Sequence, residues 1–188
     1  MPLGNDMVGY YGETNVSGLL GAMMKPPRRK VFLSYHHGGD QAYYDEFSRL
    51  FHDQYEAIRD NSLERIIQSD NTEYVMRQIR ENYINGTSCT IVLIGAQSHE
   101  RKYLDWEIKA TLDKCHGLIG IALPTHSKDS VGNVIVPERF HDNYKSGYAG
   151  WAHWNWLTVQ GLTQLINTAV AKPQLLINNT RTMRQRNG

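Results

Sequence analysis

Cysteine and long apolar runs are both scarce in this sequence of 188 residues. Its two cysteines, Cys89 and Cys115, are too few for a disulfide framework, and they are interpreted as small core residues in a reducing compartment. No apolar run approaches the roughly 20 residues that are needed to span a bilayer. The first residues lack the charged start and apolar stretch of a secretory signal. We therefore expect a cytoplasmic protein with no membrane partner.

Negatively charged residues are also missing from the last part of the chain. The formal net charge is only +1, so no overall field points to nucleic acid, and no nucleic-acid partner is expected. From residue 143 onward there is no Asp or Glu, and the charged side chains are Lys145, Lys172, Arg181, Arg184 and Arg186. Residues 173–188 are predicted to form a polar basic tail, and a solvated end is favoured over contact with an acidic partner.

Several motifs of nucleotide and metal enzymes are absent. The sequence has no G-x-x-x-x-G-K-[ST] loop, no G-x-G-x-x-G after its first strand and no G-x-S-x-G elbow. The paired acids of a phospho-receiver domain are replaced by Tyr35 and His36. No Cys/His spacing fits a zinc site, and scattered histidines are more often solvated than ligands. We expect no metal and no bound cofactor.

Apolar patterning predicts an alternation of strands and helices. The predicted strands are rich in β-branched residues, and two of them are nearly continuously apolar, as in parallel sheets covered on both faces. This alternation is typical of the α/β class with a doubly wound parallel sheet. Strands are predicted at 30–35, 87–95 and 117–124, and helices at 40–51, 70–86, 98–115 and about 156–170. Predicted helix caps are Asp40, Ser98 and the capping box Asp70/Glu73, with a left-handed end at Asn85-Gly86.

The chain is predicted to form a single α/β domain, 30–172, preceded by an irregular arm, 1–29. Residues 124–155 interrupt the alternation, because they are rich in Gly and aromatic residues and long for a structureless loop. They could form a lid or partner surface, or a packed excursion held by its tryptophans. "NVIVPERF" could add an edge strand.

Glu107 is the candidate catalytic residue in the predicted helix 98–115. At about 100° per residue, it lies about 85° from the centre of the apolar stripe that includes Leu104 and Ile108, and beside Tyr103. That is a boundary position between core and solvent. Spacing alone favours a surface glutamate that pairs with Arg101 or Lys102. A carboxylate in the crevice beyond the strand ends is the alternative.

Three segments in order resemble the TIR-like domains of bacterial Thoeris anti-phage defence and related signalling proteins. They are "KVFLSYHHGGD", "NGTSCTIVLIGAQSHERKYLDWEIKATLDKC" and "GLIGIALP", and the resemblance covers roughly residues 30–143. It implies a flavodoxin-like sheet with helices on both faces. It also implies cleavage of NAD at the nicotinamide–ribose bond, with NAD as substrate, giving nicotinamide and linear or cyclic ADP-ribose.

The resemblance also implies site residues. The glutamate of the family's W-x-x-x-E pattern matches Glu107, and Tyr103 stands where the family has tryptophan. Tyr35, His36 and Asp40 match the opening that lines the nucleotide site. Two alternatives stay open. One is a non-catalytic module that self-associates or binds another signalling protein through the aromatic segment 140–156. The other is a sensor that binds NAD or ADP-ribose without turnover.

Overall fold

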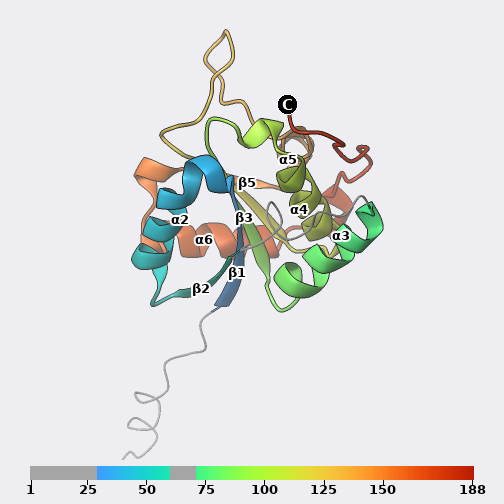
Figure 1. The fold of residues 1–188 in the computed structure, drawn as a ribbon. Helices are drawn as coiled ribbons and strands as arrows, with labels where there is room; N and C mark the ends of the chain where they lie inside the picture. The colour runs from blue at the N-terminus through green and yellow to red at the C-terminus, as the bar shows by residue number, and fades with distance from the viewer. Residues whose placement is uncertain (1–28, 60–70) are drawn as a thin grey trace, which may run out of the picture.

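The computed structural model describes residues 29–59 and 71–188, which form a five-stranded parallel sheet (Figure 1). The strand order is β2-β1-β3-β4-β5, so the predicted flavodoxin-like, doubly wound fold is confirmed. Nearly all of the predicted N-terminal arm lies outside the described residues. The strands are β1 (Arg29–Ser34), β2 (Tyr55–Arg59), β3 (Cys89–Ile94), β4 (Gly117–Ala122) and β5 (Gly150–His153).

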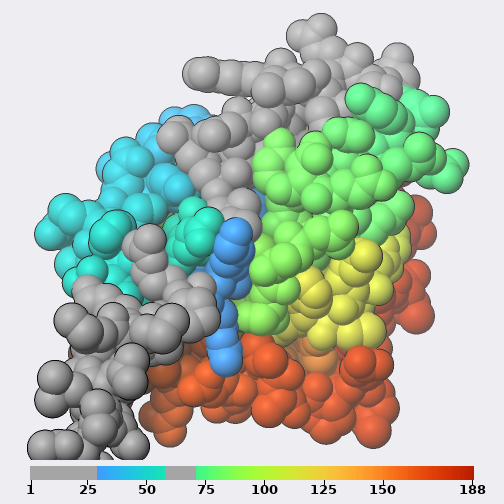
Figure 2. Space-filling model, turned by 90° about the horizontal axis from the view of Figure 1, so that it is seen from below, coloured from blue at the N-terminus to red at the C-terminus, as the bar shows by residue number. Residues whose placement is uncertain are grey.

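Helices cover both faces of this sheet. One face packs against α2 and α6, and the opposite face packs against α3, α4 and α5 (Figure 1). Seen from below, the blue strand β1 lies beside green residues of the chain, and the orange-red segment that contains α6 runs along the bottom of the view (Figure 2). The helices are α2 (His37–Phe51), α3 (Thr72–Ile79), α4 (Lys102–Asp113), α5 (Glu138–Lys145) and α6 (Val159–Val170).

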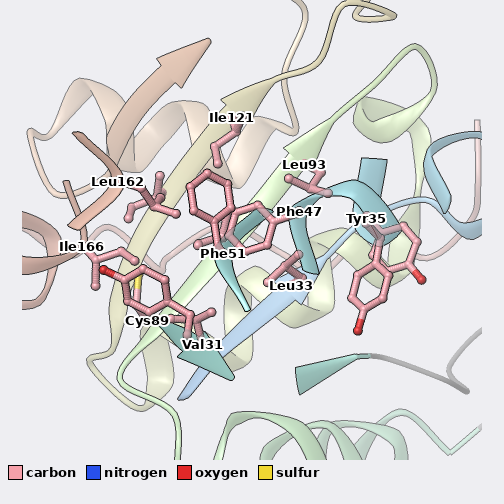
Figure 3. Close-up of a cluster of buried hydrophobic side chains, with 14 of the residues drawn as sticks. Val31, Leu33, Tyr35, Phe47, Phe51, Cys89, Leu93, Ile121, Leu162 and Ile166 are labelled. Atoms are coloured by element: carbon pink, nitrogen blue, oxygen red, sulfur yellow. The ribbon is translucent and has the colours of Figure 1, made fainter. Parts of the chain in front are cut away.

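Strand alternation divides the buried residues of β1 between the two cores. Val31 and Leu33 lie on the α2 side, with Phe47 and Phe51 of α2 packed over them (Figure 3). Phe32 lies in the opposite core with residues of α3 and α4. All residues of β3 and β4 are buried, as the nearly continuous apolar patterns predict. Apolar burial on both faces therefore fixes the register of the central strands.

Two predicted helix starts are wrong. Helix α2 begins three residues before Asp40, and its N-cap residue His36 forms no side-chain cap hydrogen bond, so Asp40 lies inside the first turn. Helix α4 begins at Lys102 and not at Ser98, because the Ser98 hydroxyl is used elsewhere: it accepts from Gly95 N–H and bonds Leu93 O. The cap of α4 therefore has to come from another part of the chain.

The third helix is close to its prediction. Its N-cap is Asn71, whose side chain accepts from Tyr74 N at 3.0 Å, while the predicted cap Asp70 lies outside the described residues. The helix continues into a π turn, Arg80–Ile84, before the chain turns away. Gly86 has φ +82°, which confirms the predicted left-handed end.

The second half of the excursion 124–155 packs against the sheet, whereas residues 128–133 are exposed in a projecting loop (Figure 1). The second half contains α5 and β5, and Phe140 and Tyr148 within it are buried. The suggested edge strand in "NVIVPERF" is reduced to one bridge between Lys128 and Val134. Neither β2 nor β5 was predicted, because both are short and mixed in polarity. Cys115 is exposed, contrary to the prediction, because α4 has already ended and the chain turns there with φ 55°.

Residues 174–188 pack against α4 and α5, so the expectation of a solvated tail is wrong (Figure 1). The physical reason is that α5 buries two polar side chains, Arg139 and Asn143, which need partners. Within the two described ranges, no helix is long and apolar enough to cross a membrane.

Candidate functional site

The sheet has its topological switch point between β1 and β3. From β1 the chain goes to β2 on one side, and β3 lies on the other side. In open parallel sheets, ligands bind outside the carboxyl ends of the strands at such a point. The residues that follow these two strand ends are His36 and Asp40 after β1, and Gly95 and Ser98 after β3.

Helix α4 points Glu107 at the seam between these two strands. On a helical wheel, Glu107 falls between Ala110 and Thr111. Ala110 packs in the cluster of Phe32 on β1, and the Thr111 hydroxyl lies 2.6 Å from the Thr90 hydroxyl on β3. Because α4 runs antiparallel to the strands, Glu107 lies one turn nearer their carboxyl ends than Thr111 does.

Ser34 is the residue of β1 that lies level with Glu107 along the sheet. Phe32 pairs with Thr90, and Ser34 pairs with Val92, two residues further along the strands. Alternation places Ser34 on the same face as Phe32, which is the face that α4 covers. The Ser34 hydroxyl is fully buried and has no hydrogen-bond partner among the described residues. A buried hydroxyl without a partner is unusual and consistent with a role in binding a ligand.

Glu107 is buried and not at a boundary: its exposed fraction is 2%. The interpretation as a surface glutamate paired with its neighbours is therefore wrong. Arg101 instead donates to the Gln97 side chain. The Lys102 ammonium lies over the rings of Tyr103 and Trp106, 5.0 and 5.5 Å from their centroids. Wheel geometry misplaced Glu107 because the predicted apolar stripe left out Trp106 and Ala110, which are also buried, so the buried face of α4 is wider than predicted.

Asp40 lies at the rim of the same seam and is also buried, with 2% of its surface exposed. Its carboxylate packs directly over Gly95, where a Cβ would come within 2.1 Å of Oδ1. Burial raises the pKa of Asp40 from 3.8 to about 6, and the hydroxyls of Thr125 and Ser98 partly oppose this shift. A carboxyl group with this pKa changes its charge near neutral pH, as functional groups often do.

The other predicted residues are divided between the two faces. Tyr35 lies on the α2 face, where it stacks on Tyr44 at 5.0 Å and donates to Gln41 at 2.9 Å. Its ring is thus separated by the sheet from Glu107. His36 is buried, and its ring lies against Gly38 in the first turn of α2. The structure therefore places Ser34 closer to Glu107 in the fold than Tyr35.

Tyr103 lies one turn before Glu107 on α4. Its ring meets that of Trp106 edge-on, with centroids 5.5 Å apart, and it is half-buried. Residues one turn apart share a helix face, and the Tyr103 ring packs against the buried cluster that contains Phe32 and Trp106. Ser34 is the residue that sequence reasoning missed. Its only signal is a lone hydroxyl at the end of an otherwise apolar strand.

Three hollows on the described surface lie away from this seam. One of about 420 Å³ is lined in part by Arg101 and Arg184, and one of about 910 Å³ in part by Tyr144 and Trp151. The third lies on the outer side of α6. None of the three is lined by Tyr35, His36, Asp40, Tyr103 or Glu107. Among the described residues, no three His, Cys, Asp or Glu side chains converge as a metal site.

Comparison with known proteins supplies the family. Residues 32–128, just over half of the chain, match the model described as Thoeris protein ThsB, TIR-like domain. The chain belongs to the ThsB TIR-like family. Of the curated proteins, "Putative cyclic ADP-D-ribose synthase ThsB1" of Bacillus cereus (strain MSX-D12) is 32% identical over 63 residues. That match covers 34% of this chain and 32% of the relative, so the chain spans about a third of the length of the curated relative it matches.

The region matched to the ThsB family contains most of the candidate site. It begins at Phe32, and it includes β3, α4 and β4. The five residues named from the resemblance all lie within it, as do Ser34 and Gly95. The matched region ends before α5, so the tail and β5 lie outside it.

Proposed function

We propose that this ThsB-family domain cleaves NAD at the nicotinamide–ribose bond and thereby produces a nucleotide signal in anti-phage defence. The single observation that carries the proposal is the burial of Glu107 against the switch point between β1 and β3. Burial penalises the charge of a carboxylate, and titratable groups in such environments cluster at functional sites. The name of the Bacillus relative, "Putative cyclic ADP-D-ribose synthase ThsB1", supports the same chemistry.

The chemistry suits a single buried carboxylate. In NAD the bond from ribose C1′ to the nicotinamide nitrogen breaks, and its electron pair leaves with the nitrogen, so the cationic ring departs as neutral nicotinamide. The ribose is left with oxocarbenium character, which a carboxylate in a partly dry site stabilises. Capture by water gives ADP-ribose and a proton. Capture by a nucleophile of the same ADP-ribose moiety gives a cyclic product.

Each of the five predicted residues, together with Ser34, has a role in this proposal. Glu107 stabilises the developing positive charge and holds the ribose hydroxyls. Ser34, at the same level of the sheet, contributes a hydroxyl to the ribose. Tyr103 offers a ring for stacking on nicotinamide or adenine. His36 and Asp40 form the rim near the strand ends, and Tyr35 orients the start of α2 from the other face through Gln41.

Product analysis tests the proposal. The purified protein is incubated with NAD over a wide range of protein concentrations, and nicotinamide and ADP-ribose isomers are separated by chromatography. The range of protein concentrations shows whether turnover depends on self-association. Release of nicotinamide supports the proposal. Its absence at every concentration, under conditions where the protein is folded, contradicts it.

A second candidate function is a protein-interaction module, which exposed aromatic residues favour. Trp156 is 78% exposed and Tyr144 is 51% exposed, and both lie in or beside the 140–156 segment next to the edge strand β5. Exposed apolar patches of this kind mark contact surfaces. Under this hypothesis, light scattering shows a mass that grows with concentration. Trp156→Ser abolishes that growth, and calorimetry shows no binding of NAD.

A further inference from the structure

Residues 178–188, which we name the clasp, run along the whole length of α4. Asn179 donates from Nδ2 to Asp113 Oδ1 at 2.8 Å, at the last residue of the helix. At the other end, the Asn187 side chain accepts from Lys102 N at 3.0 Å, at the first residue. The clasp therefore runs antiparallel to the helix that carries Glu107 and contacts both of its ends.

The clasp supplies the N-cap that α4 lacks. Arg101 occupies the N-cap position but forms no side-chain cap hydrogen bond. The first N–H groups of a helix have no partner within the helix, and an Asn side chain is among the best acceptors for them. Asn187 accepts one of these N–H groups although it lies 85 residues further along the chain. Gly188 N–H adds a bond to Glu100 O at 3.0 Å.

In the middle of the clasp, the main chain of Arg184 holds two consecutive residues of α4. Its N–H donates to Asp105 Oδ2 at 2.8 Å, and its carbonyl accepts from Trp106 Nε1 at 2.8 Å. The next residue along the helix is Glu107. Rotation or sliding of α4 that moved Glu107 away from the seam would break both bonds.

Arg139 of α5 forms a buried ion pair with α4 and also donates hydrogen bonds to the clasp. Arg139 is fully buried and binds Asp105 through Nε and Nη2, at 2.8 and 3.3 Å. Its remaining donors reach Asn179 Oδ1 at 2.8 Å and Thr182 O at 3.2 Å, both in the clasp. A buried guanidinium needs all of these acceptors. The α4–α5 pair is therefore complete only when the clasp is in place.

We propose that the clasp is a positioning device for Glu107: by capping α4 and holding Asp105 and Trp106, it sets the distance of the carboxylate from the β1–β3 seam. This inference rests on the proposed function only in its link to turnover. Arg184 and Asn187 are positioning residues, since neither lies at the seam itself. The clasp lies outside the region that matches the ThsB family.

Paired variants test the main-chain contact. Arg184→Pro deletes the N–H that donates to Asp105, while Arg184→Ala keeps it and deletes only the guanidinium. Hydrogen exchange, read by mass spectrometry on peptides of α4, is expected to speed up by about tenfold in Arg184→Pro. It is expected to stay within about twofold of wild type in Arg184→Ala. Arg186→Ala, at an exposed neighbouring position, is the charge-loss control.

The cap has its own series, which stays informative if Arg184→Pro fails to fold. Asn187→Ala removes the acceptor for Lys102 N–H and is expected to speed exchange in the first turn of α4 by about fivefold. Asn187→Asp and Asn187→Ser restore an acceptor and are expected to restore slow exchange. In the turnover assay, Asn187→Ala lowers kcat by about fivefold with KM within about twofold, and the same two variants rescue kcat.

The outcomes separate the two proposals. Unchanged exchange in α4 of both Arg184→Pro and Asn187→Ala would overturn the clasp. Faster exchange with an unchanged kcat would overturn its link to Glu107. If the wild-type protein releases no nicotinamide, the proposed function fails, and the exchange data alone still support or overturn the clasp.

Discussion

The carboxylate of Asp40 lies directly over Gly95, so that a β-carbon at residue 95 would sit 2.1 Å from Oδ1 and 2.5 Å from Cγ. Two chain segments, the first turn of α2 and the end of β3, thus meet at the switch point without room for one more carbon atom. The acid and the glycine form one structural unit at the rim of the candidate site.

The first prediction concerns this contact. Gly95→Ala forces the Asp40 side chain or the strand end to move, and we expect a loss of about 1–3 kcal/mol in the free energy of unfolding. Asp40→Ala removes the obstacle. In a double-mutant cycle measured by urea denaturation, the Gly95→Ala cost is therefore expected to shrink to near zero in the Asp40→Ala background. Equal costs in the two backgrounds would show that the contact is not rigid.

The second prediction concerns pH. The folded-state pKa of Asp40, about 6, lies above its ordinary value of 3.8, so the folded state favours the protonated form. Stability is therefore full below about pH 4 and falls as pH rises through 6, by about 3 kcal/mol at most. Asp40→Asn removes this loss. In thermal melts, the Asp40→Asn variant is expected to melt several degrees higher than wild type at pH 7.5, and no higher at pH 4.

Asp142 provides the matched control, because its pKa is shifted in the opposite direction. The hydrogen bond from Arg181 lowers the pKa of Asp142 below its ordinary value. Its contribution to stability is present above pH 4 and is lost as pH falls through the lowered pKa. Asp142→Asn is therefore expected to destabilise at pH 7.5, with the deficit closing in acid. The same sign for both variants would refute the assignment of the two environments.

The fold was largely predictable because its central strands have a simple physical cause. Helices cover Cys89–Ile94 and Gly117–Ala122 on both faces. The continuous apolar runs of these strands indicate such burial in the sequence. β2 and β5 lie at the two edges, where burial is incomplete and the pattern weakens. The helix starts at His37 and Lys102 were missed for another reason. The start of α4 depends on Asn187, which lies 85 residues away, while Ser98 bonds Gly95 and Leu93 and does not cap the helix. The start of α2 was missed because Asp40 packs over Gly95 and does not cap that helix.

The candidate site was predictable in part. Glu107 and Asp40 were identified by resemblance, but their burial depends on tertiary packing that a helical wheel does not include. Ser34 was missed because a single serine at a strand end is uninformative until the opposing helix is known. The two-residue period of β1 could have shown that Tyr35 and Ser34 face opposite sides of the sheet.

The third prediction concerns the alignment of α4 on β3. The Thr111 hydroxyl donates to Glu107 O at 2.8 Å and lies 2.6 Å from the Thr90 hydroxyl, so both threonines tie the main chain of Glu107 to the strand. Thr111→Val leaves the buried Thr90 hydroxyl without this partner and is expected to cost about 1–3 kcal/mol in unfolding free energy.

The double variant separates hydrogen bonding from packing. With Thr90→Val added, both hydroxyls are replaced by methyl groups of similar shape, and we expect most of the lost stability to return. Denaturant unfolding of the four proteins gives the coupling energy. Strictly additive losses would mean that the two hydroxyls do not share a bond.

The fourth prediction separates stability from function at Ser34. Because its buried hydroxyl has no partner among the described residues, Ser34→Ala is expected to leave the free energy of unfolding unchanged or slightly higher. Under the proposed mechanism, the same variant loses a contact to the ribose and its kcat/KM for NAD falls by about tenfold. A variant that is less stable and equally active would assign Ser34 to the core instead.

The fifth prediction addresses the central claim, that Glu107 is the catalytic carboxylate. Nicotinamide release from NAD is measured for wild type, for Glu107→Gln and for Glu100→Gln, an isosteric control at a half-exposed glutamate that pairs with His99. We expect Glu107→Gln to lower kcat by about 100- to 1,000-fold, the usual cost of removing one electrostatic stabiliser. Glu100→Gln is expected to stay near wild type. Comparable turnover in folded Glu107→Gln protein would contradict the account.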